Sequence, residues 1–104
     1  MAGWTDEWAD DARVEYLAAL RHYLTIDARL AADFADRVDR SVESILVNRA
    51  VASAYLAGTR RKLLGRFPFA IVYRVRSSEC VVEIVALVHL RRRPGYWLGR
   101  VQSG

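Results

Sequence analysis

The chain has 104 residues, of which 53% are hydrophobic, and it carries a formal net charge of +4 at pH 7. This length is enough for one folded domain with a modest core, and the hydrophobic fraction excludes an intrinsically disordered protein. No apolar run approaches the roughly 20 residues that span a bilayer, and a single cysteine, Cys80, excludes an internal disulfide framework.

Charge is distributed unevenly along the chain. Residues 1–45 contain ten acidic and five basic residues, whereas residues 46–104 contain two acidic and 11 basic residues. We expect the second half to produce a positive field that attracts an anionic partner, either nucleic acid or an acidic protein segment. The N-terminus lacks the basic-then-apolar pattern of a signal peptide, and the lone thiol is typical of a reducing compartment. These features predict a cytoplasmic protein.

The first half predicts a pair of helices. Residues 1–8 show no alternation, so a first strand there is doubtful. Apolar residues recur at helical spacing from about residue 10 to residue 24, and again from residue 28 to about residue 49. The short link contains Asp27, a good N-cap residue, which predicts an antiparallel helical hairpin. Residues 50–58 are Ala-rich and lack proline, so we expect the second helix to continue to about residue 55.

We assign the side chains of both helices to a buried stripe or an outer face. Arg13, Glu15 and Arg21 fall outside the stripe of the first helix. Its stripe comprises Ala12, Tyr16, Ala19, Leu20 and Tyr23, widened by Leu17 and Leu24. The stripe of the second helix comprises Leu30, Ala31, Phe34, Val38, Ser41, Val42 and Ile45.

Three runs in the second half predict β-strands. Residues 69–75 alternate in polarity and are rich in β-branched and aromatic side chains. Residues 81–90 are almost continuously apolar, which is typical of a central strand buried on both faces. A polar loop of hairpin length, residues 76–80, joins these strands. Residues 59–64 form a shorter, basic strand that we place at a sheet edge, where an added strand could pair.

Helices followed by consecutive strands predict an α+β fold. We expect a helical hairpin packed on one face of a small antiparallel sheet. Residues 1–104 form a single domain: a helical hairpin at about 10–55, a sheet at about 59–90 and a basic aromatic tail at 91–104.

The strings RFPFAIVYRV and IVALVHLRRRPGYW, followed by Arg100, resemble the RelE/ParE superfamily of bacterial toxins. The resemblance implies a β-α-α-β-β-β fold and the toxin role in a type II toxin–antitoxin pair, neutralised by an acidic antitoxin. The long helical hairpin and the Arg-Pro-Gly-Tyr-Trp ending favour the ParE-like, plasmid-stabilisation branch. ParE-like members resemble inhibitors of DNA gyrase that have no enzymatic activity of their own.

Two alternatives remain open. RelE-like members are similar to ribosome-dependent mRNA endonucleases, whose partners are the ribosome and mRNA. RNA cleavage needs a base, an acid and cations for the developing charge, and no complete constellation is visible. A structural, hydrogen-bonded role is favoured for the histidine in the apolar strand. The candidates for an endonuclease are Arg60, Arg61, Lys62, Arg66, His89, Arg91 and Tyr96. The second alternative is a non-toxic interaction module that keeps the fold.

The tail supplies the candidates for target binding. Tyrosine, tryptophan and arginine dominate interface hot spots, although a basic run is often simply solvated and Trp97 could instead fold back to close the core. The predicted target-binding residues are Arg91, Arg92, Arg93, Tyr96, Trp97 and Arg100. No Cys/His set for zinc and no P-loop is present, so we expect neither a metal nor a cofactor.

Overall fold

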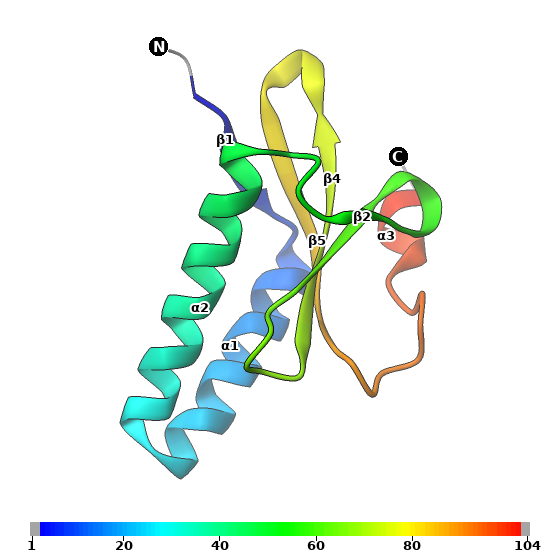
Figure 1. The fold of residues 1–104 in the computed structure, drawn as a ribbon. Helices are drawn as coiled ribbons and strands as arrows, with labels where there is room; N and C mark the ends of the chain where they lie inside the picture. Colours follow the sequence, from blue (N-terminus) through cyan, green and yellow to red (C-terminus); the bar gives the residue numbers. More distant parts are fainter. Residues whose placement is uncertain (1–2, 103–104) are drawn as a thin grey trace.

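The computed structural model describes residues 3–102, in which two long helices pack against a five-stranded sheet (Figure 1). Two short 3₁₀ turns, η1 (Leu56–Gly58) and η2 (Ser77–Glu79), lie in the connections. The helices and strands are β1 (Thr5–Trp8), α1 (Asp10–Ile26), α2 (Ala28–Val47), β2 (Ser53–Ala54), β3 (Arg60–Leu63), β4 (Phe69–Arg76), β5 (Val81–His89) and α3 (Leu98–Gln102).

The α+β prediction is confirmed, with one correction to the sheet. The strand order is β1-β5-β4-β3-β2, and β3, β4 and β5 are consecutive antiparallel strands as predicted. However, β1 pairs in parallel with β5, so the sheet is mixed and not wholly antiparallel. The doubtful first strand exists although its sequence does not alternate. Its residues 5–7 are exposed, and the strand is held by backbone pairing with β5, by the packing of Trp8 against the Tyr16 ring at 5.7 Å and by the ion pair of Glu7 with Arg76.

The helical hairpin forms as predicted at its turn. The Asp27 side chain accepts a hydrogen bond from the Arg29 backbone N–H at 2.8 Å, so Asp27 is the N-cap of α2. The predicted stripe of α2 is buried, except that Leu30 is only partly covered. Two predictions for α1 are wrong, because Leu17 and Leu24 are 48% and 55% exposed. They lie at the margin of the stripe and no element covers them there.

The second helix ends earlier than predicted, at Val47 instead of about residue 55. Asn48 adopts an extended conformation, and its side chain accepts a hydrogen bond from the Ala50 N–H at 3.1 Å. Asparagine favours such local turns over helix continuation. The chain then forms β2, which pairs with Arg60 and Arg61 of β3. The predicted edge strand is therefore covered over half of its length.

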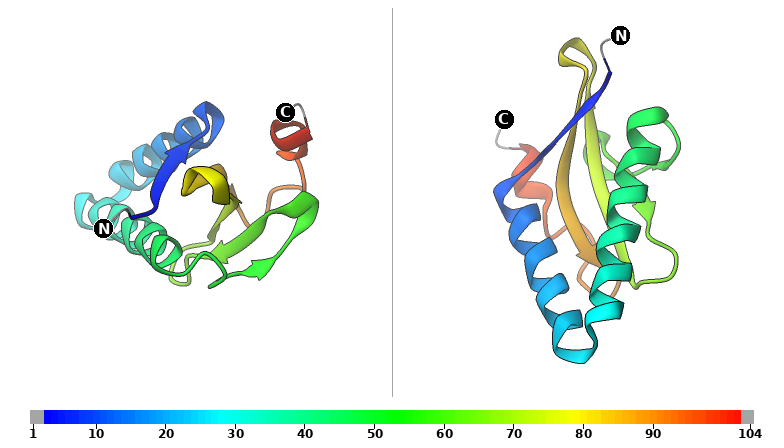
Figure 2. Two further views of the ribbon diagram at one scale, coloured as in Figure 1. Left: turned by 90° about the horizontal axis from the view of Figure 1, so that it is seen from above. Right: turned by 90° about the vertical axis from the view of Figure 1, so that its left-hand side faces the viewer.

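Hydrophobic clusters lie on both faces of the sheet. On the helix side, Phe34 of α2 packs with Ile71, Tyr73 and Ile84. On the opposite side, Trp97 packs against small and β-branched residues of β4 and β5. The strand β5 is therefore buried on both faces, which confirms the prediction from its apolar run. Figure 2 shows α1 and α2 on one side of the sheet and α3 on the other.

Candidate functional site

The basic aromatic tail crosses the sheet face that the helices leave open. Trp97 is only 1% exposed, and its ring lies 6.0 Å from the Tyr55 ring. The tail therefore returns to the body of the protein after Arg91, Arg92 and Arg93, which are exposed. The prediction that Trp97 binds a target stays untested. In this structure the indole anchors the tail.

A second anchor joins the tail to α1 through the carboxylate of Glu15. This carboxylate accepts hydrogen bonds from the Leu87 N–H at 3.1 Å and from the Tyr96 hydroxyl at 2.6 Å. The Arg100 guanidinium donates to both of its oxygens at 3.0 Å. Arg100 also donates to the Val85 carbonyl at 3.0 Å. Arg100, predicted to bind a target, thus has an intramolecular ion pair whose side chains are 21% and 16% exposed.

The Val85 carbonyl is available to Arg100 because of a β-bulge. Val72 lies opposite Ala86, whereas Tyr73 lies opposite Ile84, so Val85 is an extra residue in β5. An extra residue leaves ladder partners unpaired, and Arg100 satisfies the freed oxygen. Sequence reasoning missed Glu15 and assigned it to the outer face. Its spacing could have indicated burial, because Glu15 lies three residues after buried Ala12 and four before buried Ala19.

The contacts with Glu15 shift the pKa values of Tyr96 and Arg100. Burial, the hydrogen bond to Glu15 and the charge of Glu15 together raise the pKa of Tyr96 well above its ordinary value of 10.0. The hydrogen bond to Glu15 likewise raises the pKa of Arg100. At neutral pH the Tyr96 hydroxyl therefore stays protonated and donates to the carboxylate.

The strand β3 directs its basic side chains to different faces of the sheet. Arg60 lies opposite Tyr73 and Lys62 opposite Ile71, both of which belong to the helix-side cluster. Arg61 lies opposite a residue of the other cluster, so it shares the face of the tail. The Arg60 guanidinium donates to the backbone carbonyl of Ala52 at 2.7 Å. This hydrogen bond ties Arg60 to the segment that precedes β2.

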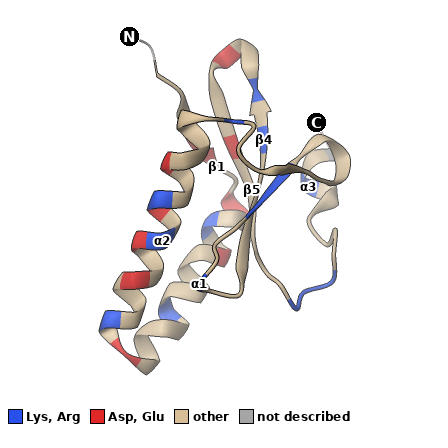
Figure 3. Cartoon of the chain, viewed as in Figure 1, with Lys and Arg blue, Asp and Glu red and all other residues tan. Residues whose placement is uncertain are grey.

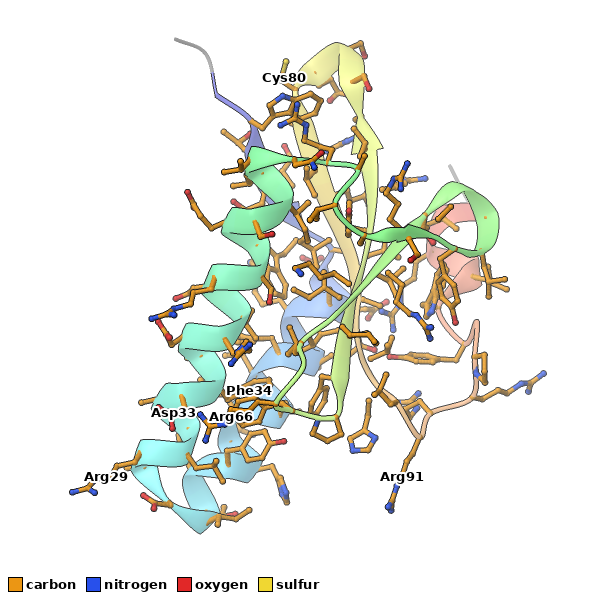
Figure 4. All side chains as sticks on the ribbon, in the orientation of Figure 1. Arg29, Asp33, Phe34, Arg66, Cys80 and Arg91 are labelled. Atoms are coloured by element: carbon orange, nitrogen blue, oxygen red, sulfur yellow. The ribbon has the colours of Figure 1, made fainter. Side chains whose placement is uncertain are left out.

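The remaining endonuclease candidates outside β3 also lie apart from one another, and Figure 4 shows Arg66 and Arg91 on different parts of the protein. Arg66 pairs with Asp33 of α2 at 3.5 Å, beside the helical hairpin. Arg91 extends from the tail away from the body of the protein. His89 packs against the Phe69 ring at 5.0 Å, and its Nδ1 accepts a hydrogen bond from the Arg91 N–H. The seven candidates are therefore spread over several surfaces.

Aromatic and basic residues line one small hollow, which we call the tail hollow. It has a volume of about 40 Å³ and lies between β3 and the tail. The guanidinium of Arg61 lies 4.6 Å from the centre of the Tyr55 ring, and that of Arg92 lies 3.9 Å from the Tyr96 ring. Its lining includes Tyr55, Arg61, His89, Arg92, Arg93 and Tyr96.

Two larger grooves flank α1. The first, of about 300 Å³, lies between α1 and the sheet end, where Ala18, His22 and Phe69 contribute to its lining. The second, of about 360 Å³, lies along the helical hairpin between Leu17 and Val38. Both are mainly apolar, in contrast with the tail hollow. Residues 3–102 contain no group of three or more His, Cys, Asp or Glu side chains that could hold a metal ion.

A family model described as "ParE toxin of type II toxin-antitoxin system, parDE" matches residues 7–94. The chain belongs to the ParE toxin family. The matched range covers both long helices, β2 to β5 and Arg91–Arg93, and it ends before Tyr96, Trp97 and Arg100. Toxins of this family pair with an antitoxin in type II systems.

A solved structure supports the fold of this ParE family member. The chain is similar to one described as "Chromosomal ParDE TA system from P. aeruginosa", with a TM-score of 0.71 and 18% sequence identity. The similarity covers 86% of this chain and 97% of that chain. No curated protein matches the sequence. Within residues 3–102, no helix is both long and apolar enough to cross a membrane.

Proposed function

We propose that this chain is a cytoplasmic toxin that inhibits DNA gyrase and that an acidic antitoxin neutralises it. The observation that carries the proposal is the match to the ParE toxin family over residues 7–94. The positive charge of the tail supports it, because Arg91, Arg92 and Arg93 are exposed and available to a large partner. Figure 3 displays these arginines together on the segment between β5 and α3.

The tail residues divide into two groups in this proposal. Arg91, Arg92 and Arg93 contact the target, together with the exposed edge of Tyr96. Trp97 and Arg100 hold the tail in place through the sheet face and through Glu15. Arginine and tyrosine suit an interface because they combine apolar area with directed hydrogen bonds.

The distribution of the endonuclease candidates argues for gyrase over mRNA. Arg66 is paired with Asp33 and Arg60 is bound to a carbonyl. The raised pKa of Tyr96 makes this phenol a poor base at neutral pH. Of the seven endonuclease candidates, only Arg61, His89 and Tyr96 line the tail hollow, and no carboxylate within residues 3–102 lines it to complete an acid–base pair.

We further propose where the antitoxin binds. The groove between α1 and α2 can accept an apolar helix face, and exposed Val14, Leu17 and Leu24 extend that apolar surface along α1. Beyond β2, Lys62 and Leu63 leave part of the β3 edge uncovered, so an extended antitoxin segment can pair there. An acidic partner would complement the basic second half of the chain.

Two assays run in parallel test the target. Purified protein is added to a gyrase supercoiling and DNA-cleavage reaction, and separately to translating ribosomes with an mRNA substrate. We expect supercoiling to stall with trapped DNA breaks while the mRNA stays intact. Cleavage of mRNA in phase with codons, with gyrase unaffected, would instead make the protein an endonuclease. Expression that leaves growth unchanged would indicate a non-toxic interaction module.

A further inference from the structure

Three arginines with no acidic partner converge on the tail hollow. Arg61 comes from β3, whereas Arg92 and Arg93 come from the tail, about 30 residues later in the sequence. None of the three forms a salt bridge within residues 3–102. Elsewhere in that range carboxylates pair with five arginines: Arg40, Arg66, Arg74, Arg76 and Arg100.

Aromatic rings hold two of these guanidinium groups at the walls of the hollow. Arg61 lies over Tyr55, whose ring in turn contacts buried Trp97. Arg92 lies over Tyr96, whose hydroxyl is bound to Glu15. Both arginines are therefore positioned before any ligand arrives, which lowers the entropy lost on binding. Like charges held together in this way repel one another, and a bound anion relieves the repulsion.

We propose that the tail hollow binds a backbone phosphate of duplex DNA. Guanidinium groups match the non-bridging oxygens of a phosphate in charge and in planar hydrogen-bond geometry. The nearest carboxylate, Glu15, is already occupied by Arg100. Arg91, which points outward from the same segment (Figure 4), is placed to meet a neighbouring phosphate.

The hollow is too small to take a helix or strand of a partner protein. A volume of about 40 Å³ admits one compact anionic group but no helix or strand. The 300 Å³ groove shares His89, Arg92 and Tyr96 with the hollow, but the 360 Å³ groove along the helical hairpin, where we place the antitoxin, shares no lining residue with it. The antitoxin and DNA thus use different surfaces. In a gyrase complex, which rests on the proposed function, the tail would contact the bound DNA as well as the enzyme.

Binding is tested with the purified toxin and a short fluorescent DNA duplex, by anisotropy over a series of salt concentrations. We expect the logarithm of the association constant to fall linearly with the logarithm of salt concentration. Because the three arginines share one phosphate, Arg61→Ala and the double variant Arg92→Ala with Arg93→Ala should each reduce that slope by about one. Arg29→Ala is the matched control, since Arg29 is exposed at the start of α2 and remote from the hollow (Figure 4). It should leave the slope nearly unchanged.

Two competing probes identify the ligand. Inorganic phosphate should displace the duplex weakly, whereas an acidic peptide of equal charge should not displace it from the hollow. Binding of the peptide but not of the duplex would overturn the proposal, as would equal slopes for Arg61→Ala and the wild-type chain. Binding of inorganic phosphate alone would overturn the assignment to DNA. Because these experiments contain no gyrase, a toxin that binds DNA yet leaves supercoiling intact would refute only the proposed function.

Discussion

At the scale of the residue, one carboxylate does most to position the tail. Glu15 binds a strand amide, a phenol and a guanidinium that are distant in sequence. Without Glu15 the strand amide and the phenol would lose their partner, and the guanidinium would keep only the Val85 carbonyl and Asp11. Residue-scale reasoning from the sequence was right about Asp27 but wrong about Glu15. A cap depends on adjacent residues, whereas the partners of Glu15 come from β5 and the tail.

Glu15→Ala is expected to destabilise the fold by about 1–3 kcal/mol, because it leaves the Leu87 N–H without an acceptor and removes the bidentate partner of Arg100, which keeps only Asp11 at 3.5 Å and the Val85 carbonyl. Urea denaturation measures this loss. The control is Asp36→Ala, which breaks an exposed pair with Arg40 and should change the stability by no more than about 0.5 kcal/mol. Equal effects of both variants would contradict the role given to Glu15.

The raised pKa of Tyr96 predicts a loss of stability at alkaline pH. The folded state holds the phenol protonated, whereas the unfolded state releases the proton above about pH 10. The free energy of unfolding should therefore be constant below that pH and should fall above it, by up to about 1.4 kcal/mol per pH unit for one group. Tyr96→Phe should show a shallower fall. The stability of this variant should still fall somewhat at alkaline pH, because burial also raises the pKa values of Tyr16, Tyr23 and Tyr73.

Chemical denaturation at several alkaline pH values tests this expectation, with phenolate absorbance recorded in parallel. A fall in Tyr96→Phe as steep as that of the wild-type chain would show that this phenol does not contribute.

At the scale of the element, the helical hairpin and the β4–β5 hairpin could be predicted because their signals are local. Helical periodicity located α1 and α2, and the polar loop before Val81 separated two apolar strands. Edge elements were harder. The strand β1 has three exposed residues, and β2 has only two residues in all, so neither carries a pattern. Both exist because neighbouring strands offer unpaired backbone groups.

Asp27 joins the two long helices and should matter to both. Asp27→Ala removes the cap on the Arg29 N–H and is expected to lower the free energy of unfolding by about 1 kcal/mol. Asp27→Asn is the matched control, because asparagine caps a helix about as well as aspartate. Thermal and urea unfolding report the difference. An equal loss in both variants would mean that the charge of Asp27, and not its cap, is what stabilises the hairpin.

In the molecule as a whole, the acidic and basic residues lie on different elements, and the apolar groove and the basic hollow lie at different places. The helices carry most of the acidic residues, while β3 and the segment after β5 are basic (Figure 3). The apolar groove along the helical hairpin and the small basic hollow beside the tail have no lining residue in common. This separation allows one small domain to present different surfaces to partners of different chemistry.

Reversing Arg91, Arg92 and Arg93 to glutamate should slow association with the cognate antitoxin and weaken its dependence on salt. Stopped-flow binding at several ionic strengths measures both quantities. Reversal of Arg29 and Arg40, which are exposed on α2, provides the comparison. If the tail variant kept the wild-type rate and salt dependence, the tail would not steer the antitoxin.

Local patterns in the chain were enough to predict the α+β class, the turn at Asp27, the central position of β5 and the resemblance to the toxin superfamily. These depend on periodicity and on neighbouring residues, which a linear pattern records. Long-range packing is what buries Trp97, joins Arg100 to Glu15 and brings Arg61 and Arg92 to the same hollow. The reason is that these contacts join residues far apart in the chain, and packing of the tail on the sheet selects them, whereas local sequence specifies only which side chains are available.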